Sequence, residues 1–246
     1  MHHVAIHDLR LRGQGSADLE AIPLVILVGV TGVGKSTTLA ALEALGCPLA
    51  LLPDRRELTD RFILGGEPVR DREERFRRTA AYREQHPGGM SAVLAGLSLA
   101  RPPQEQLVFD GLRGLEEVEH AARHLPRARF VVLDAPDVVR IERLVSRADA
   151  FDAVSVQVSG SRLEALENLE GVREVLSEAE LRELARLPVE PAELAAGARI
   201  VIAERRNYDP QAAAERLMTL DPLRTLYLDT ATQGPELVAS RIAQWL

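Results

Sequence analysis

The sequence predicts an α/β fold in which a parallel β-sheet lies between two layers of helices and carries a helical insertion. Short apolar runs rich in β-branched residues recur along the chain, and amphipathic helical patterns separate them. Strands that alternate with helices in this way form parallel sheets with right-handed crossovers. The chain has 246 residues, the length of one large domain or of one domain with an insertion.

The first core strand is predicted at residues 23–28, a continuous apolar run typical of a strand buried on both faces. Residues 4–11 alternate loosely before it and predict an edge strand. The later strands are predicted at residues 49–52, 106–111, 129–134, 198–203 and 225–229. Helices are predicted at residues 115–124, 137–148, 210–220 and 235–246.

Two stretches interrupt the alternation within what we expect to be a single domain over residues 1–246. Residues 58–105 separate the second and third core strands, and residues 149–197 form a lid-like helical insertion. Capping-box spacing predicts that helices begin after Ser161 and Ser177. We expect the apolar stripe of this insertion to pack internally; a homodimer surface or a moving lid is the alternative.

Composition and charge exclude several classes of protein. The formal net charge is −7, which argues against a nucleic-acid coat or a polybasic membrane binder. Cys47 is the only cysteine, so there is no intrachain disulfide or cysteine zinc site. No apolar run approaches the ~18–20 residues that span a bilayer. The first residues lack an export signal, so we expect a cytoplasmic protein.

A glycine-rich loop follows the first core strand and opens a helix. It has the Walker A, or P-loop, pattern G-x-x-x-x-G-K-[ST], whose backbone N–H groups surround phosphate oxygens at a helix N-terminus. Lys35 is expected to reach the β- and γ-phosphates and Ser36 to ligate Mg²⁺. The residues predicted to bind the nucleotide here are Gly29, Thr31, Gly32, Val33, Gly34, Lys35, Ser36 and Thr37.

Lys35 is also the only lysine among the 30 basic residues. The abundance of arginine is explained by coding composition, which does not explain where the one lysine stands. A compact ammonium fits between phosphate groups, whereas a guanidinium presents a wide planar fork. The same bias makes any arginine cluster in this chain weak evidence for a site.

Acidic residues end several predicted strands, where ligands of parallel sheets bind. Each could equally be a turn residue or a helix cap. They are Asp54, Asp110, Asp134, Glu204 and Asp229.

The order of these elements resembles the P-loop kinases of the nucleoside and nucleotide kinase group, which includes adenylate-kinase-like, dephospho-coenzyme-A-kinase-like and shikimate-kinase-like enzymes. Beside the Walker A loop, the resemblance rests on Asp54-Arg55 after the second strand and on the strand that ends at Asp110. It also rests on the arginine-bearing segment 140–147 and the strand at 199–203. The resemblance implies a P-loop NTPase fold, ATP or GTP with Mg²⁺ as cofactors, and an unidentified small-molecule acceptor.

The resemblance also implies roles for individual residues. Asp110 resembles the Walker B carboxylate that holds Mg²⁺, and Asp54 resembles the residue that engages the acceptor hydroxyl. Arg140, Arg143 and Arg147 resemble lid arginines, and their spacing places them on one helix face, although a solvated arginine face is the alternative.

Two further arginine-bearing segments have both a functional and a structural interpretation. Arg206 and Tyr208 follow the predicted strand at 198–203, a position that lies near the nucleotide base in the resembling kinases. Asp209-Pro210 is also an ordinary helix start. Arginines are dense over residues 70–83, where a salt-bridged helix surface is the favoured interpretation and a site for an anionic acceptor the alternative. Arg113 is a further candidate to contact acceptor or phosphate.

Three functions remain open at this point. The favoured one is a Mg-ATP-dependent kinase. The second is an ATP-hydrolysing switch of the AAA or ABC type; against it, Asp110 is followed by Gly111 and not by a water-activating Glu. The third is a nucleotide-binding regulatory module without turnover.

Overall fold

The computed structural model describes residues 1–66, 69, 72–146 and 160–246. A six-stranded sheet forms its centre, in the order β1-β5-β7-β4-β8-β9, and every neighbouring pair of strands is parallel. These strands are β1 (His2–His3), β4 (Leu24–Val28), β5 (Leu49–Leu51), β7 (Gln106–Leu112), β8 (Ala128–Asp134) and β9 (Thr225–Asp229). The predicted three-layer α/β fold is confirmed.

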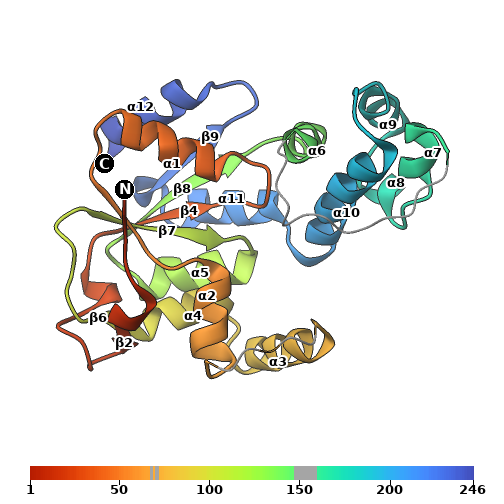
Figure 1. Cartoon of the computed structure of the whole chain (residues 1–246). Helices are drawn as coiled ribbons and strands as arrows, with labels where there is room; N and C mark the ends of the chain where they lie inside the picture. The colour runs from red at the N-terminus through yellow and green to blue at the C-terminus, as the bar shows by residue number, and fades with distance from the viewer. Residues whose placement is uncertain (67–68, 70–71, 147–159) are drawn as a thin grey trace.

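Helices cover both faces of the sheet (Figure 1). One face carries α1 (Lys35–Ala44) and α12 (Pro235–Trp245), which pack on each other and on an apolar cluster that includes Leu27 and Leu133. The other carries α4 (Gly89–Ala95), α5 (Leu115–His124) and α11 (Pro210–Leu220) around Phe109 and Phe130. A continuous apolar strand such as β4 is therefore buried on both of its faces, as its sequence predicts.

A second, three-stranded antiparallel sheet packs near α4 in the order β2-β6-β3. It consists of β2 (Leu9–Leu11), β6 (Leu97–Leu99) and β3 (Ala17–Asp18). The edge strand predicted over residues 4–11 is therefore only partly right. Its last three residues form a strand in the small sheet, and the edge of the large sheet is His2–His3.

The segment between β5 and β7 contains α2 (Arg55–Leu58), a π-helical turn at Thr59–Ile63 and α3 (Arg72–Gln85) before α4. Asp54 caps α2 in a capping box with Glu57. In Figure 1 this segment lies beside the sheet, with α3 extending away from it.

A helical unit follows α6 (Asp137–Val145) and contains α7 (Arg162–Glu167), α8 (Val172–Val175), α9 (Glu178–Leu184) and α10 (Pro191–Asn207). Both predicted capping boxes, at Ser161 and Ser177, are present. The apolar stripe packs within the unit and against α6, around Leu166, Leu184 and Val201. The internal-packing interpretation of the stripe is thus confirmed for residues 160–207.

The strand predicted at residues 198–203 is wrong, because these residues lie inside the 17-residue helix α10. A short apolar run fits a buried strand and a buried helix equally well. Here Leu194, Ala198 and Val201 recur at helical spacing and are buried together. Glu204 consequently ends no strand; it stands on a helix that runs back toward the sheet.

Candidate active site

The glycine loop joins the end of β4 to the start of α1 and is held in a conformation that only glycine adopts readily. Gly29, Gly32 and Gly34 have φ values of 152°, 86° and 95°. A Cβ atom on Gly29 would stand 2.6 Å from the carbonyl oxygen of Leu133, and one on Gly32 would stand 3.0 Å from Arg140. The loop is therefore fixed by its own glycines and by the neighbouring segments β8 and α6.

Lys35 folds back over the loop. Its Nζ donates to the carbonyl oxygens of Gly29 (2.9 Å) and Val30 (3.1 Å) and lies 3.7 Å from Oδ1 of Asp110. Burial lowers the pKa of the Lys35 ammonium, and Asp110 opposes this shift. The ammonium is poorly solvated and makes only backbone hydrogen bonds and one long ion pair, an environment that an anionic ligand would improve.

Asp110 stands on β7 opposite Leu27 of β4, next to the irregularity at which the register of the two strands shifts. Its Oδ1 is buried and makes no hydrogen bond to any residue that the structure describes. Burial raises the pKa of Asp110, while Lys35 and Arg113 lower it and Asp54 adds to the rise.

This orphaned carboxylate oxygen, with the exposed Ser36 in the first turn of α1, fits Mg²⁺. Mg²⁺ is usually held by one or two protein oxygens, by phosphates and by water. The described residues contain no cluster of three His, Cys, Asp or Glu that could hold a metal by themselves. The donor set present therefore suits a cation that arrives with a nucleotide.

Asp54 is the N-cap of α2, one of the roles that the sequence allows for it. Its Oδ1 accepts a hydrogen bond from the backbone N–H of Glu57 at 2.8 Å. The residue remains exposed, and its charge contributes to the pKa of Asp110. The two carboxylates predicted for the site are therefore close enough to interact electrostatically.

Arg140 and Arg143 lie three residues apart on α6, and both reach the glycine loop. Arg140 is 1% exposed, and its Nε donates to the carbonyl oxygen of Thr31 at 2.8 Å. Arg143 donates to the carbonyl oxygen of Gly32 at 3.1 Å and to Oγ1 of Thr230 at 2.9 Å. Both guanidinium groups thus hold the loop through its backbone. Arg147 lies outside the described residues.

The sequence predicts Glu204 at the end of a strand, whereas the structure places it on the helix α10. Although on α10, it accepts from the backbone N–H (3.0 Å) and the hydroxyl (2.6 Å) of Thr31. It also pairs with Arg113 at 2.7 Å and with Arg140. Glu204 is 8% exposed, so the helical unit contributes a buried carboxylate to the glycine loop.

A second buried carboxylate, Glu117, organises the neighbouring wall. It accepts two hydrogen bonds from Arg55 and one from the backbone N–H of Arg113. Burial raises the pKa of Glu117, but its pairing with Arg55 and the backbone N–H donors of Arg113 and Met90 together outweigh burial and leave the pKa below its usual value. The only sequence signal for this pair is the Asp54-Arg55 dipeptide, which does not reveal the partner.

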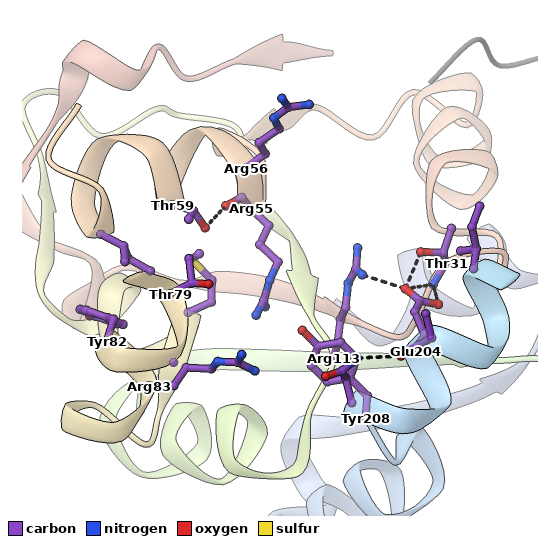
Figure 2. Close-up of a pocket in the computed structure, with 16 residues that line it drawn as sticks. Thr31, Arg55, Arg56, Thr59, Thr79, Tyr82, Arg83, Arg113, Glu204 and Tyr208 are labelled. Atoms are coloured by element: carbon purple, nitrogen blue, oxygen red, sulfur yellow. Dashed lines mark hydrogen bonds and ion pairs between the residues drawn. The ribbon is translucent and has the colours of Figure 1, made fainter. Parts of the chain in front are cut away.

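A cavity of about 560 Å³ lies between α2, α3 and α10 (Figure 2). Thr31 of the glycine loop borders it, with Arg113 and Glu204 beside it. Arg55 and Arg83 extend toward its centre, whereas Arg56 points away from it. Tyr82 and Tyr208 stand on opposite sides.

A second hollow, of about 440 Å³, lies at the other end of the loop. It is lined by Gly34 and Thr37 of the loop and α1, by Arg143, and by the segment 230–235 between β9 and α12. Asp229 holds this segment by accepting from the backbone N–H of Ala231 and the hydroxyl of Thr232, both at 2.8 Å. The glycine loop thus separates two hollows.

The placement expected for Arg206 and Tyr208 rested on a strand at 198–203, where the structure has the helix α10 instead. Arg206 donates to the carbonyl oxygen (3.2 Å) and the carboxylate (3.1 Å) of Glu170 within the helical unit. Tyr208 packs close to Gly114 and lines the larger cavity. Neither residue lines the hollow at Gly34 and Thr37.

Some arginines of the segment 70–83 lie on a helix surface, and one lines the larger cavity. Arg77 pairs with Glu74, and Arg78 donates to the carbonyl oxygen of Leu64 at 2.9 Å, as in a surface helix. Arg83 instead lines the larger cavity. Arg70 and the side chains of Arg72 and Arg75 lie outside the described residues.

The parallel sheet, the glycine loop at the end of β4 and the lysine and aspartate beside it define a kinase-like P-loop NTPase. Residues 25–157 match the family model described as an AAA domain, and the chain belongs to this family.

Among curated proteins, the chain is similar to several UPF0200 proteins. It is 27% identical over 139 residues to one from Saccharolobus solfataricus, a match that covers 55% of this chain and 70% of the relative. A second, from Aeropyrum pernix, is 35% identical over 127 residues, which cover 50% of this chain and 64% of the relative.

Solved structures of similar fold include kinases and a sulfotransferase. A shikimate kinase from Acinetobacter baumannii in complex with shikimate has a TM-score of 0.41 and 16% identity over 92% of this chain and 93% of that one. A sulfotransferase from Alicyclobacillus acidocaldarius has a TM-score of 0.47 and 13% identity over 92% and 81%. A gluconokinase from Sinorhizobium meliloti has a TM-score of 0.36 and 17% identity over 89% and 93%.

Proposed function

We propose that the chain transfers the γ-phosphoryl group of Mg-ATP to a small-molecule acceptor. The observation that carries this proposal is the pair of hollows at the two ends of the glycine loop, one at Gly34 and Thr37 and one at Thr31 and Arg113. A phosphotransferase has two ligands to place on either side of the transferred group, whereas an ATP-hydrolysing switch needs only the nucleotide and water.

The nucleotide is assigned to the smaller hollow, with its phosphates on the loop over residues 29–37. Backbone N–H groups of the loop and the N-terminus of α1 bind the phosphate oxygens. Lys35, released from the carbonyl oxygens it now contacts, binds the β- and γ-phosphates. Arg143 borders the same hollow and is the arginine of α6 best placed to contact the nucleotide.

Mg²⁺ would be held by Ser36 and Asp110 together with phosphate oxygens, and when bound it neutralises charge on the β- and γ-phosphates. Arg140 has two carboxylate partners and a loop carbonyl already, so its proposed role is to hold the loop. Arg206 and Tyr208 do not line the smaller hollow and have no role in the proposed nucleotide site.

The acceptor is assigned to the larger cavity. An acceptor oxygen attacks the γ-phosphorus and forms the new O–P bond, while the bond between that phosphorus and the β–γ bridging oxygen breaks. ADP leaves with the bonding electron pair. If the acceptor is a hydroxyl, its proton passes to the carboxylate of Asp54. Because phosphoryl transfer depends mostly on positioning, this proton can leave late.

The test is transfer of labelled γ-phosphate from ATP, and separately from GTP, across a panel of nucleosides, nucleotides, sugars and coenzyme precursors. A labelled acceptor that requires both Mg²⁺ and Lys35 supports the proposal. Release of labelled phosphate with no labelled acceptor would favour the ATP-hydrolysing switch. Nucleotide binding without either reaction would favour a regulatory module.

A further inference from the structure

The larger cavity carries more positive charge than its own carboxylates balance. Among its described lining residues, Arg55, Arg56, Arg83 and Arg113 face the single acidic residue Glu204. Glu204 is already engaged by Arg113 and Arg140. Arg55 is balanced by Glu117. The charges left over on this wall are those of Arg56 and Arg83.

Arg83 is the more informative of the two, because it points into the cavity and Arg56 points away (Figure 2). It is half-buried near the end of α3 and makes no hydrogen bond or ion pair with any described residue. Some arginines elsewhere on helix surfaces pair with nearby carboxylates: Arg77 pairs with Glu74, and Arg182 pairs with Glu178. Others, such as Arg199 on α10, have no such partner among the described residues. What sets Arg83 apart is that it has no such partner and also points into the cavity.

A second observation on the same wall points the same way. The Nε of Arg113 is buried and has no acceptor among the described residues. A buried donor without an acceptor costs free energy, so native structures usually provide one. Arg83 and Arg113 thus both line the wall of the cavity that adjoins the glycine loop at Thr31, Arg83 with its guanidinium pointing into the cavity and Arg113 with a buried donor that lacks an acceptor among the described residues.

The other residues that line the cavity indicate the chemistry of the uncharged part of the ligand. Tyr82 and Tyr208 stand on opposite sides, and Ile63, Met90 and Ile200 add apolar surface. Aromatic side chains bind planar or apolar groups through their faces and edges. The volume of about 560 Å³ lies within the range of sites for small organic molecules.

We infer that the acceptor is an organic anion: a planar or apolar body that carries a phosphate or carboxylate group, with the anionic group bound by Arg83 beside Arg113. That the bound anion is an acceptor rests on the proposed function, but the anion site itself can be tested without any turnover. It names the substrate class of the reaction, since neutral sugars and alcohols lack the group that Arg83 would bind.

The test is calorimetric titration of the full chain, held saturated with Mg²⁺ and a non-hydrolysable ATP analogue so that the glycine loop is occupied. The probes are phenyl phosphate, benzoate and benzyl alcohol, which share a ring and differ in charge. We expect at least one of the two anions to bind about tenfold or more tightly than the alcohol. Whether phenyl phosphate or benzoate binds more tightly shows whether the site prefers a phosphate ester or a carboxylate.

Two variants on α3 identify the site. Arg83→Gln should remove the preference for the anion, and Arg83→Lys should restore part of it. Arg77→Gln, on the exposed side of the same helix, is the matched control and should leave it unchanged. Equal binding of all three probes, no binding of either anion, or an undiminished preference in a folded Arg83→Gln protein would each overturn the inference. If the anion binds as expected but no labelled acceptor forms, the anion site stands and the proposed kinase function fails.

Discussion

Replacement of Glu204 by glutamine provides a direct test of how the helical unit is joined to the glycine loop. Glu204 is 8% exposed and pairs with Arg113 and Arg140, and Arg140 is itself 1% exposed. Removing one partner of a buried ion pair costs roughly 3–5 kcal/mol, because the remaining charge stays buried. Glutamine keeps the volume and one acceptor oxygen for Thr31, so we expect the lower value, about 3 kcal/mol.

For a chain of this size, about 1 kcal/mol shifts the melting temperature by about 2–4 °C. Differential scanning calorimetry without nucleotide should therefore show Glu204→Gln melting about 6–12 °C below the parent. Glu170→Gln is the control, because Glu170 is 91% exposed and pairs with Arg206 on the surface. Such a pair contributes about 1 kcal/mol or less.

A Glu204→Gln protein that melts within about 2 °C of the parent would refute the reasoning, since the buried pairs would then contribute no more than a surface pair. A double-mutant cycle with Arg113→Gln refines the result. A coupling energy near zero would mean that Glu204 acts through Arg140 and Thr31 alone.

Three further predictions concern the loop, the metal and the buried pair. Lys35→Ala should abolish turnover, and Lys35→Arg should do so as well because a planar fork replaces a compact ammonium; undiminished turnover in a folded Lys35→Ala protein contradicts the role given to the loop. Asp110→Asn should weaken the Mg²⁺ dependence of turnover, and a metal titration that matches the parent would make Asp110 structural. Although burial raises the pKa of Glu117, pairing with Arg55 and hydrogen bonds from backbone N–H groups together leave it below 4.5, so the stabilisation is complete above that pH and is lost as the pH falls through the lowered pKa. Melting temperatures recorded across this acidic range should fall more steeply for the parent than for Glu117→Gln, and parallel curves would show that the pair does not titrate.

None of the helices among the described residues is long and apolar enough to cross a bilayer. The sequence leads to the same expectation through the absence of any long apolar run. The structure adds where the apolar residues go: they form the two clusters that flank the sheet and the third cluster of the helical unit.

The sequence by itself determined the elements whose signals are local. The glycine loop lies within eight consecutive residues, and the strand before it and the helix after it have clear apolar patterns. The helices at Leu115–His124 and Pro210–Leu220 are predicted to the residue, because their periodicity is local and, for the second, the capping residue Asp209 directly precedes the helix. The role of Asp54 as a helix cap is equally local and was available as the alternative interpretation.

The tertiary structure alone decided the features that join distant segments. The run at residues 198–203 has the composition of a strand, and only its burial among α6 to α9 makes a helix the better solution. Glu204 meets Thr31 across 173 residues, and Glu117 meets Arg55 across 62. No periodicity encodes such pairs, because which carboxylate neutralises a buried arginine depends on how the layers pack and not on spacing along the chain.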